Sequence, residues 1–158
     1  MGVNGNTEIL AAARALIESE TNLIANLANI AALLYHRVPE VNWVGFYLWE
    51  ARSGEWVLGP FMGKPACTRI RPQRGVVGTA LAVGQTLAVR DVHEFLGHIA
   101  CDPDSRSEVV VPIWSEGRVV AGLDVDSPQV GRFPSQDVEL LELVAEGLGA
   151  SWNRCHGY

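Results

Sequence analysis

Two residues that can act together in thiol chemistry lie seven positions apart near the middle of the chain. Cys101 sits in a segment of polar and turn-forming residues, 98–106, and Glu108 opens the apolar run Val109-Val-Val111. A loop carried by a rigid strand is a common place for reacting groups, because the strand fixes their position while the loop gives access. We therefore interpret Cys101 as a nucleophile and Glu108 as an acid beside it.

A second thiol would complete the set that redox chemistry needs. Such chemistry uses a nucleophilic thiolate, an acid for a leaving oxygen and usually a second thiol that captures the resulting sulfenic acid. Cys67 lies in a turn-rich segment and is a candidate for the second thiol. Lys64, Arg69 and Arg71 are its neighbours in sequence and would favour a thiolate if their side chains faced it. Lone cysteines are most often small buried residues, so composition leaves a reactive thiol, a buried thiol and a metal ligand open.

Two further carboxylates follow in the second strand of the hairpin that Glu108 begins. Asp124 and Asp126 are two positions apart, so they lie on the same face of a strand. If that face is turned inward, the three acids line a pocket where crowding and burial raise at least one pKa, so that one carboxyl keeps its proton near neutral pH. They would also suit the ammonium group of an amino acid. The alternative, equally weighted on residue types alone, is a solvated strand end before an Asp-Ser-Pro turn.

Aromatic and histidine residues offer two weaker patterns. Trp43 and Tyr47 are four positions apart, so on a strand they share one face. They could wall a pocket for a thioether or methyl group, although an aromatic strand face is more often plain core. His93 and His98 match no compact spacing of zinc ligands with the cysteines, and we expect no metal site.

The elements that would position these residues follow from hydrophobic periodicity. Helical spacing predicts a helix over about 7–37, with a break near 18–20 and Thr21 as a cap, and a last helix capped by Ser135. Strand-like patterns and one short helix lie between them, namely strands at 41–49 and 55–62, a strand or ordered loop at 65–70, a helix at 79–83, and strands at 86–91, 108–114 and 119–125. Hairpins without βαβ crossovers favour an α+β fold, an antiparallel sheet with the N- and C-terminal helices packed largely on one face.

Length, charge and cysteine count limit the classes of protein. The 158 residues contain no repeat or linker, so we expect a single domain over 1–158. Twelve basic against 18 acidic residues, a net charge of -6, argue against a nucleic-acid partner. There is no secretory signature and no apolar stretch of about 18 residues, which predicts a cytoplasmic protein without a membrane span. Three cysteines are an odd count, which weakens a structural disulfide.

These residues occur together in a known family. The chain resembles the free methionine-(R)-sulfoxide reductases, which are single-domain proteins with the GAF fold, over about residues 42–128 and with compatible flanking helices. The motifs that carry the resemblance are Asn42-Trp-Val-Gly-Phe-Tyr47, Leu58-Gly-Pro-Phe61, Gly63-Lys-Pro-Ala-Cys-Thr-Arg-Ile70, Arg74-Gly-Val-Val-Gly-Thr-Ala80, Asp91-Val-His93, Gly97-His-Ile-Ala-Cys-Asp102, Ser107-Glu-Val-Val-Val-Pro112 and Asp124-Val-Asp-Ser-Pro128. GAF domains that only sense small molecules are not expected to carry Gly-His-Ile-Ala-Cys-Asp.

The resemblance implies roles for the two cysteines. Cys101 would attack the sulfur of free L-methionine-(R)-sulfoxide, and Cys67 would resolve the resulting sulfenic acid as a disulfide. A thioredoxin-type dithiol would regenerate the thiols, without a metal or organic cofactor. Many members carry another cysteine where this chain has Val77, so Cys67 must pair directly with Cys101 or with an external thiol. Cys155 lies outside the family pattern.

The resemblance also implies a substrate pocket. Residues Glu108, Asp124 and Asp126 would handle the sulfoxide oxygen and the amino group of the substrate, and Trp43 and Tyr47 would shape the methyl pocket. Two other functions stay open at this point. One is a non-catalytic GAF-type module that binds or senses a small molecule, and the other is a scaffold that forms a homodimer through its first and last helices.

Overall fold

The computed structural model describes residues 3–99 and 101–158, so Met1, Gly2 and Ala100 lie outside the described residues. Within these ranges the chain forms four α-helices, six strands and two short 3₁₀ helices. In chain order they are α1 (Val3–Ser19), α2 (Leu23–Arg37), β1 (Trp43–Glu50), β2 (Glu55–Gly63), β3 (Arg69–Ile70), α3 (Gly75–Val83), β4 (Leu87–Val89), η1 (Val92–Glu94), β5 (Ser107–Ser115), β6 (Arg118–Ser127), α4 (Ser135–Ser151) and η2 (Trp152–Arg154). None of the described helices has the length and apolar character needed to cross a membrane.

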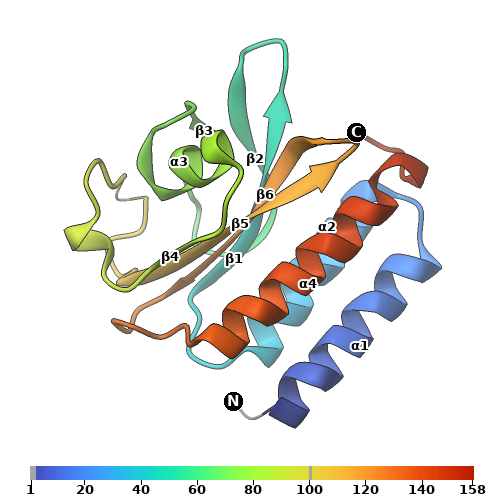
Figure 1. Ribbon diagram of the computed structural model, residues 1–158, viewed down its shortest axis with the longest axis horizontal. Coiled ribbons are helices and arrows are strands. Elements are labelled where there is room, and N and C mark those ends of the chain that lie inside the picture. The colour runs from blue at the N-terminus through green and yellow to red at the C-terminus, as the bar shows by residue number, and fades with distance from the viewer. Residues whose placement is uncertain (1–2, 100) are drawn as a thin grey trace.

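The strands form one antiparallel sheet in the order β3-β2-β1-β6-β5-β4 (Figure 1). The neighbours β1–β2 and β5–β6 are the two hairpins that the sequence predicts. Pairing of β1 with β6 joins the hairpins and places them at the centre of the sheet, while the short strands β3 and β4 form its edges. The predicted α+β architecture is confirmed.

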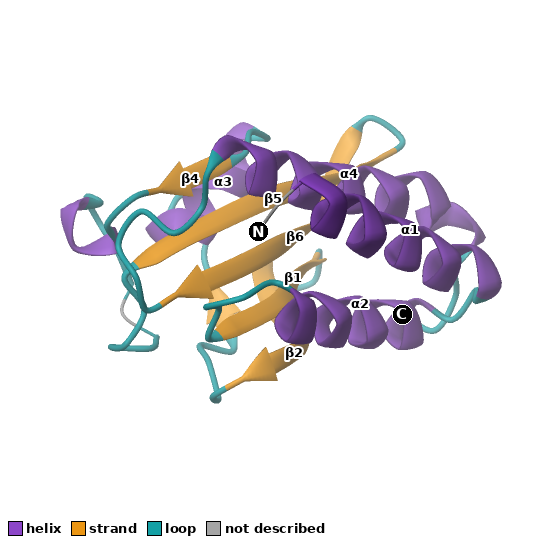
Figure 2. Ribbon diagram, turned by 90° about the horizontal axis from the view of Figure 1, so that it is seen from below, coloured by secondary structure: helices purple, strands orange, loops and turns teal. Residues whose placement is uncertain are grey.

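The two faces of the sheet carry separate cores because side chains alternate along each strand. Val44 and Phe46 of β1 and Leu123 of β6 belong to the cluster on the side of α2 and α4, and α1 packs against both of these helices (Figure 2). Trp43 and Tyr47 belong to the cluster on the opposite side, where α3 covers the sheet. Three of the four α-helices therefore share one face, and α3 lies on the face that bears the predicted site residues.

The long helices begin at other residues than the sequence indicates. The first helix begins at Val3 rather than near residue 7. Asn22 caps α2 in place of Thr21, because its side-chain oxygen accepts the backbone N–H of Ala25 at 3.0 Å. At α4 the capping position belongs to Pro134, and Ser135 is already helical. Both misplaced caps are one residue from the true position, within the usual uncertainty of helix ends.

Helix α3 begins four residues earlier than predicted, at Gly75 instead of position 79. The two glycines in its first turn are poor helix formers, so propensity hides the start of the helix. Their presence has a packing reason. A Cβ on Gly78 would meet the carbonyl oxygen of Arg71, and Gly75 has a φ of +64°, which favours glycine.

Candidate active site

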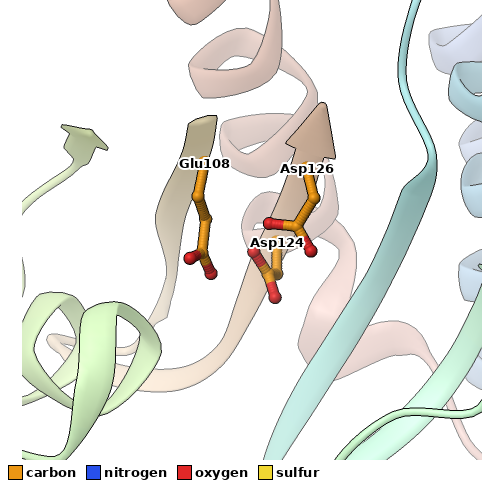
Figure 3. Close-up of side chains that lie close together, drawn as sticks. All are labelled: Glu108, Asp124 and Asp126. Atoms are coloured by element: carbon orange, nitrogen blue, oxygen red, sulfur yellow. The ribbon is translucent and has the colours of Figure 1, made fainter. Parts of the chain in front are cut away.

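Three carboxylates meet on the α3 face of the sheet. Strand register pairs Glu108 of β5 directly with Asp126 of β6, and Asp124 lies two positions before it on the same face. Their side chains point toward one another (Figure 3), and one oxygen from each lies within 4.8 Å of the others. Glu108 is 8% exposed and Asp124 is 5% exposed. The inward orientation is confirmed, and the alternative of a solvated strand end is wrong.

Burial makes this carboxylate cluster retain protons. It raises the pKa of Asp124 and of Asp126 well above the usual range, and repulsion between the charges adds to the effect. Burial also raises the pKa of Glu108, although a hydrogen bond with Asp124 opposes the shift. Interactions of Asp124 with Glu108 and Asp126 raise its pKa further. The carboxylate cluster can therefore supply both a negative charge and a proton to a bound molecule.

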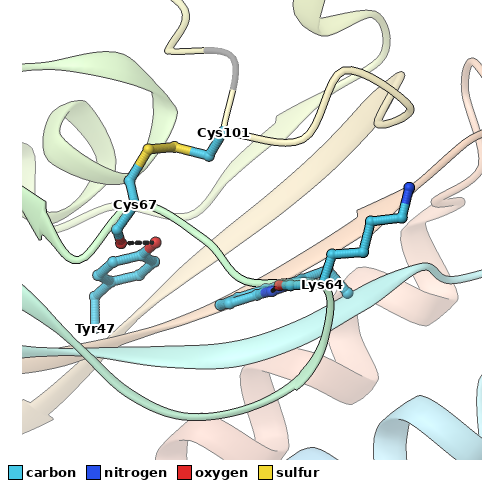
Figure 4. Close-up of a disulfide and its surroundings, with 5 residues drawn as sticks. Tyr47, Lys64, Cys67 and Cys101 are labelled. Atoms are coloured by element: carbon cyan, nitrogen blue, oxygen red, sulfur yellow. Dashed lines mark hydrogen bonds between the residues drawn. A yellow bond between two sulfur atoms is a disulfide. The ribbon is translucent and has the colours of Figure 1, made fainter.

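The aromatic pair is built beside the acids. Trp43 of β1 pairs with Asp126 across the β1–β6 register, and its ring stacks on that of Tyr47 with centroids 6.1 Å apart. The indole N–H of Trp43 donates to the carbonyl oxygen of Lys64 at 3.1 Å. The Tyr47 hydroxyl donates to the carbonyl oxygen of Cys67 at 2.9 Å (Figure 4). The pair therefore fixes the backbone of the Cys67 segment as well as forming an apolar wall.

A disulfide joins Cys67 to Cys101, with 5.5 Å between their Cα atoms (Figure 4). The direct pairing implied by the family resemblance is thus present in this structure. Because each sulfur is bonded to the other, neither is a thiolate ligand for zinc in this form. Among the described residues, the group that brings three potential metal ligands together is the carboxylate cluster, and its charge suits an ammonium group as well.

One pocket connects these features. Its lining residues come from β1, β5, β6, α3 and the segments that carry the cysteines: Trp43, Tyr47, Pro65, Ala66, Ile70, Arg74, Gly75, Val76, Val77, His98, Ile99, Cys101, Asp102, Ser105, Glu108, Asp124 and Asp126. Every predicted site residue except Cys67 lines it, and Cys67 reaches it through the disulfide. Val77 also lines the pocket, at the position where many family members carry a further cysteine.

Several lining residues were not predicted. Arg74 precedes the first turn of α3, where the backbone N–H groups of residues 75–77 have no partner within the helix. A cation and a helix N-terminus therefore lie in the same pocket as the acids. Asp102 contributes a buried oxygen without a hydrogen-bond partner in the described chain, and its charge helps to raise the pKa of Asp126. The glycine-flanked start of α3 is the one sequence signal that could have indicated Arg74.

Comparisons with known proteins agree with this geometry. The sequence model of the GAF domain family matches residues 10–152. The chain is 50% identical over 133 residues to the free methionine-R-sulfoxide reductase of Escherichia coli (strain K12). The aligned residues cover 84% of this chain and 79% of that protein. The chain belongs to the free methionine-(R)-sulfoxide reductase family of GAF domains.

Two further proteins are similar to this chain over most of its length. Protein YtsP of Bacillus subtilis (strain 168) is 53% identical over 134 residues, which are 85% of this chain and 82% of that protein. The X-ray structure of free methionine-R-sulfoxide reductase from Neisseria meningitidis in complex with its substrate matches with a TM-score of 0.93 at 42% identity. That match covers 98% of this chain and 93% of the other. The family resemblance predicted from the sequence motifs is confirmed.

Proposed function

We propose that this protein reduces free L-methionine-(R)-sulfoxide to L-methionine. The observation that carries the proposal is the disulfide between Cys67 and Cys101 beside a pocket that contains two buried carboxylates and one half-buried carboxylate, all with raised pKa values. The relative from Escherichia coli bears the name of this activity, and the Neisseria meningitidis reductase is described with its substrate bound.

The first step is oxygen transfer to Cys101. Its thiolate attacks the sulfoxide sulfur, and a protonated carboxyl of the cluster gives its proton to the sulfoxide oxygen. The bond between sulfur and oxygen breaks as the hydroxyl passes to the Cys101 sulfur. Methionine leaves, reduced by two electrons, and Cys101 is left as a sulfenic acid, oxidised by the same two electrons. Because the pKa of Asp124 is raised well above the usual range and its side chain lies against both other carboxyls, we propose Asp124 as the acid.

The second step regenerates the thiols. The Cys67 thiolate attacks the Cys101 sulfur, a disulfide forms, and the hydroxide takes up a proton and leaves as water. A thioredoxin-type dithiol then attacks the disulfide and is itself oxidised, which restores both cysteines. The cytoplasm supplies such dithiols, and we propose it as the location of the protein.

Charge separation in the pocket suits a free amino acid. The carboxylate cluster would hold the ammonium group, while Arg74 and the start of α3 would face the carboxylate group. The stacked rings of Trp43 and Tyr47 would contact the methyl group at sulfur. A methionine sulfoxide within a peptide has neither terminal charge, so it would leave the buried acids unpaired.

A turnover assay tests the proposal and separates it from the binding-module alternative. Wild type with a thioredoxin system should reduce free methionine-(R)-sulfoxide but neither the (S) epimer nor the N-acetylated compound. Cys101→Ser should abolish turnover, whereas Cys155→Ser, which alters the cysteine outside the pocket, should retain it. Stereospecific binding without turnover by reduced wild type would favour a sensor module, and full activity of Cys101→Ser would refute the assigned nucleophile.

A further inference from the structure

An ion pair ties together the two segments that carry the cysteines. Lys64 Nζ lies 2.7 Å from Asp104 Oδ2. Lys64 precedes Cys67 by three positions and Asp104 follows Cys101 by three, so the ion pair and the disulfide link the same two segments. Over residues 3–99 and 101–158, no other hydrogen bond or ion pair joins segment 64–68 to segment 101–105.

The two segments are held to the rest of the protein in different ways. The Cys67 segment is fixed to the sheet at three points, because its carbonyl groups accept from the side chains of Trp43 and Tyr47 and from the backbone N–H of Leu58. The Cys101 segment bonds largely within itself: the backbone N–H of Asp104 donates to the side chain of Asp102 at 2.9 Å. Besides Asp104, one side chain of the segment forms a hydrogen bond with a described residue outside it. The Ser105 hydroxyl oxygen accepts from the side-chain amide of Asn42 at 3.3 Å. When the disulfide is reduced, the Cys101 segment thus keeps few bonds that direct it toward Cys67.

We propose that Lys64 and Asp104 are a positioning pair that keeps the Cys101 segment beside Cys67 in the reduced protein and so accelerates closure of the disulfide. This inference rests on the proposed function, in which the Cys67 thiolate displaces hydroxide from the Cys101 sulfenic acid and water leaves. Val77 gives the pair particular importance in this chain. Without a third cysteine in the pocket, the oxidised Cys101 has no relay and the two segments must meet directly.

Activation of the Cys67 thiolate by Lys64 is the competing role, since a nearby cation stabilises a thiolate. Figure 4 shows the Lys64 side chain extending away from the disulfide, and its ammonium group pairs with Asp104 instead. That hydrogen bond raises the pKa of Lys64, which keeps the pair ionised. The two roles make opposite predictions for Asp104→Asn. Loss of the pair slows closure if the pair positions the segment, whereas a freed ammonium group leaves closure unchanged or faster if it activates the thiolate.

Rapid-quench single turnover of the prereduced protein tests the positioning pair, with methionine and the Cys67–Cys101 disulfide measured in the same samples. At low ionic strength, Lys64→Gln and Asp104→Asn should each slow disulfide closure by about two- to five-fold, the range expected from an exposed ion pair. Methionine formation should keep its rate. The exchange of both residues, Lys64→Asp with Asp104→Lys, should restore closure. About 1 M salt should slow wild type to the rate of the single variants, because it screens exposed charges.

Arg37→Gln is the matched control. It breaks an exposed ion pair with Glu8 at 3.6 Å, between α1 and α2, and should leave closure unchanged. Unchanged closure in Asp104→Asn, or failure of the exchanged pair to restore it, would overturn the proposal. Closure can also be started with hydrogen peroxide, which oxidises a thiolate to a sulfenic acid without sulfoxide. A wild type that closes with peroxide but forms no methionine would refute the proposed function, while the positioning pair would still be judged by the variants.

Discussion

Replacement of Asp124 by Asn should flatten the pH dependence of stability. One carboxylate oxygen from each of Glu108, Asp124 and Asp126 lies within 4.8 Å of the other two. Two unit charges at that separation repel by about 3–4 kcal/mol at an effective dielectric constant of about 20. Full ionisation of the cluster is therefore costly, and the folded protein retains protons that the unfolded chain releases.

The sign of the effect follows from the direction of the pKa shifts. The pKa values of Asp124 and Asp126 are raised by folding, whereas an unfolded Asp titrates at about 3.9. Above about pH 4 the folded state holds more protons than the unfolded state, so stability falls as pH rises until the raised pKa values are passed. Each retained proton contributes a slope of about 1.4 kcal/mol per pH unit within that window. Asn cannot bind the proton, and its amide can donate to both neighbours.

Urea unfolding of the oxidised proteins at pH 4 to 8 measures this effect. Above about pH 5, the free energy of unfolding of wild type should fall more steeply with pH than that of Asp124→Asn, by up to about 1.4 kcal/mol per pH unit for the one proton that Asn cannot bind. Glu139→Gln, an exposed acid on α4, should keep the wild-type slope. The same Asp124→Asn protein should lose about 100-fold or more in turnover, the contribution typical of a general acid. A variant with the wild-type pH slope would refute the account of a proton-retaining cluster.

Three further substitutions test how the pocket is built. Tyr47→Phe removes the hydroxyl that holds the Cys67 carbonyl group, so disulfide closure measured by thiol alkylation should slow by about two- to ten-fold. An unchanged rate would show that the bond does not position Cys67. Gly45→Ala places a Cβ against the Trp43 ring, and thermal unfolding should show a loss of about 1–3 kcal/mol; wild-type stability would contradict the packing. Val77→Cys adds a thiol to the pocket lining, and peptide mapping after one turnover should find a disulfide that includes position 77. Exclusive formation of the wild-type disulfide would show that this position is out of reach.

Alternation along the strands made much of the site predictable. The spacing of Asp124 and Asp126 indicated a common face, and the hairpin placed Glu108 near them. Whether that face was buried could not be read from β5 and β6 alone. It depends on α3 and the Cys101 segment, which cover the face and are brought there by tertiary packing.

Other features lay beyond sequence reasoning because they depend on contacts between distant segments. The Lys64–Asp104 pair spans 40 positions, and sequence proximity suggested Cys67 as the partner of the lysine instead. Arg74 was missed because two glycines concealed the start of α3. The extent of the domain over residues 1–158 and the homodimer through the first and last helices remain predictions, and light scattering of the purified protein would test the dimer.

The most direct test of the proposed chemistry is a single turnover without external reductant. Prereduced wild type should form about one methionine per chain and a Cys67–Cys101 disulfide, as the two-thiol scheme requires, while Cys155 stays a free thiol. Cys67→Ser should form the same amount of methionine and leave a sulfenic acid on Cys101 that dimedone traps. Methionine formed while Cys101 remains an unmodified thiol would contradict the account.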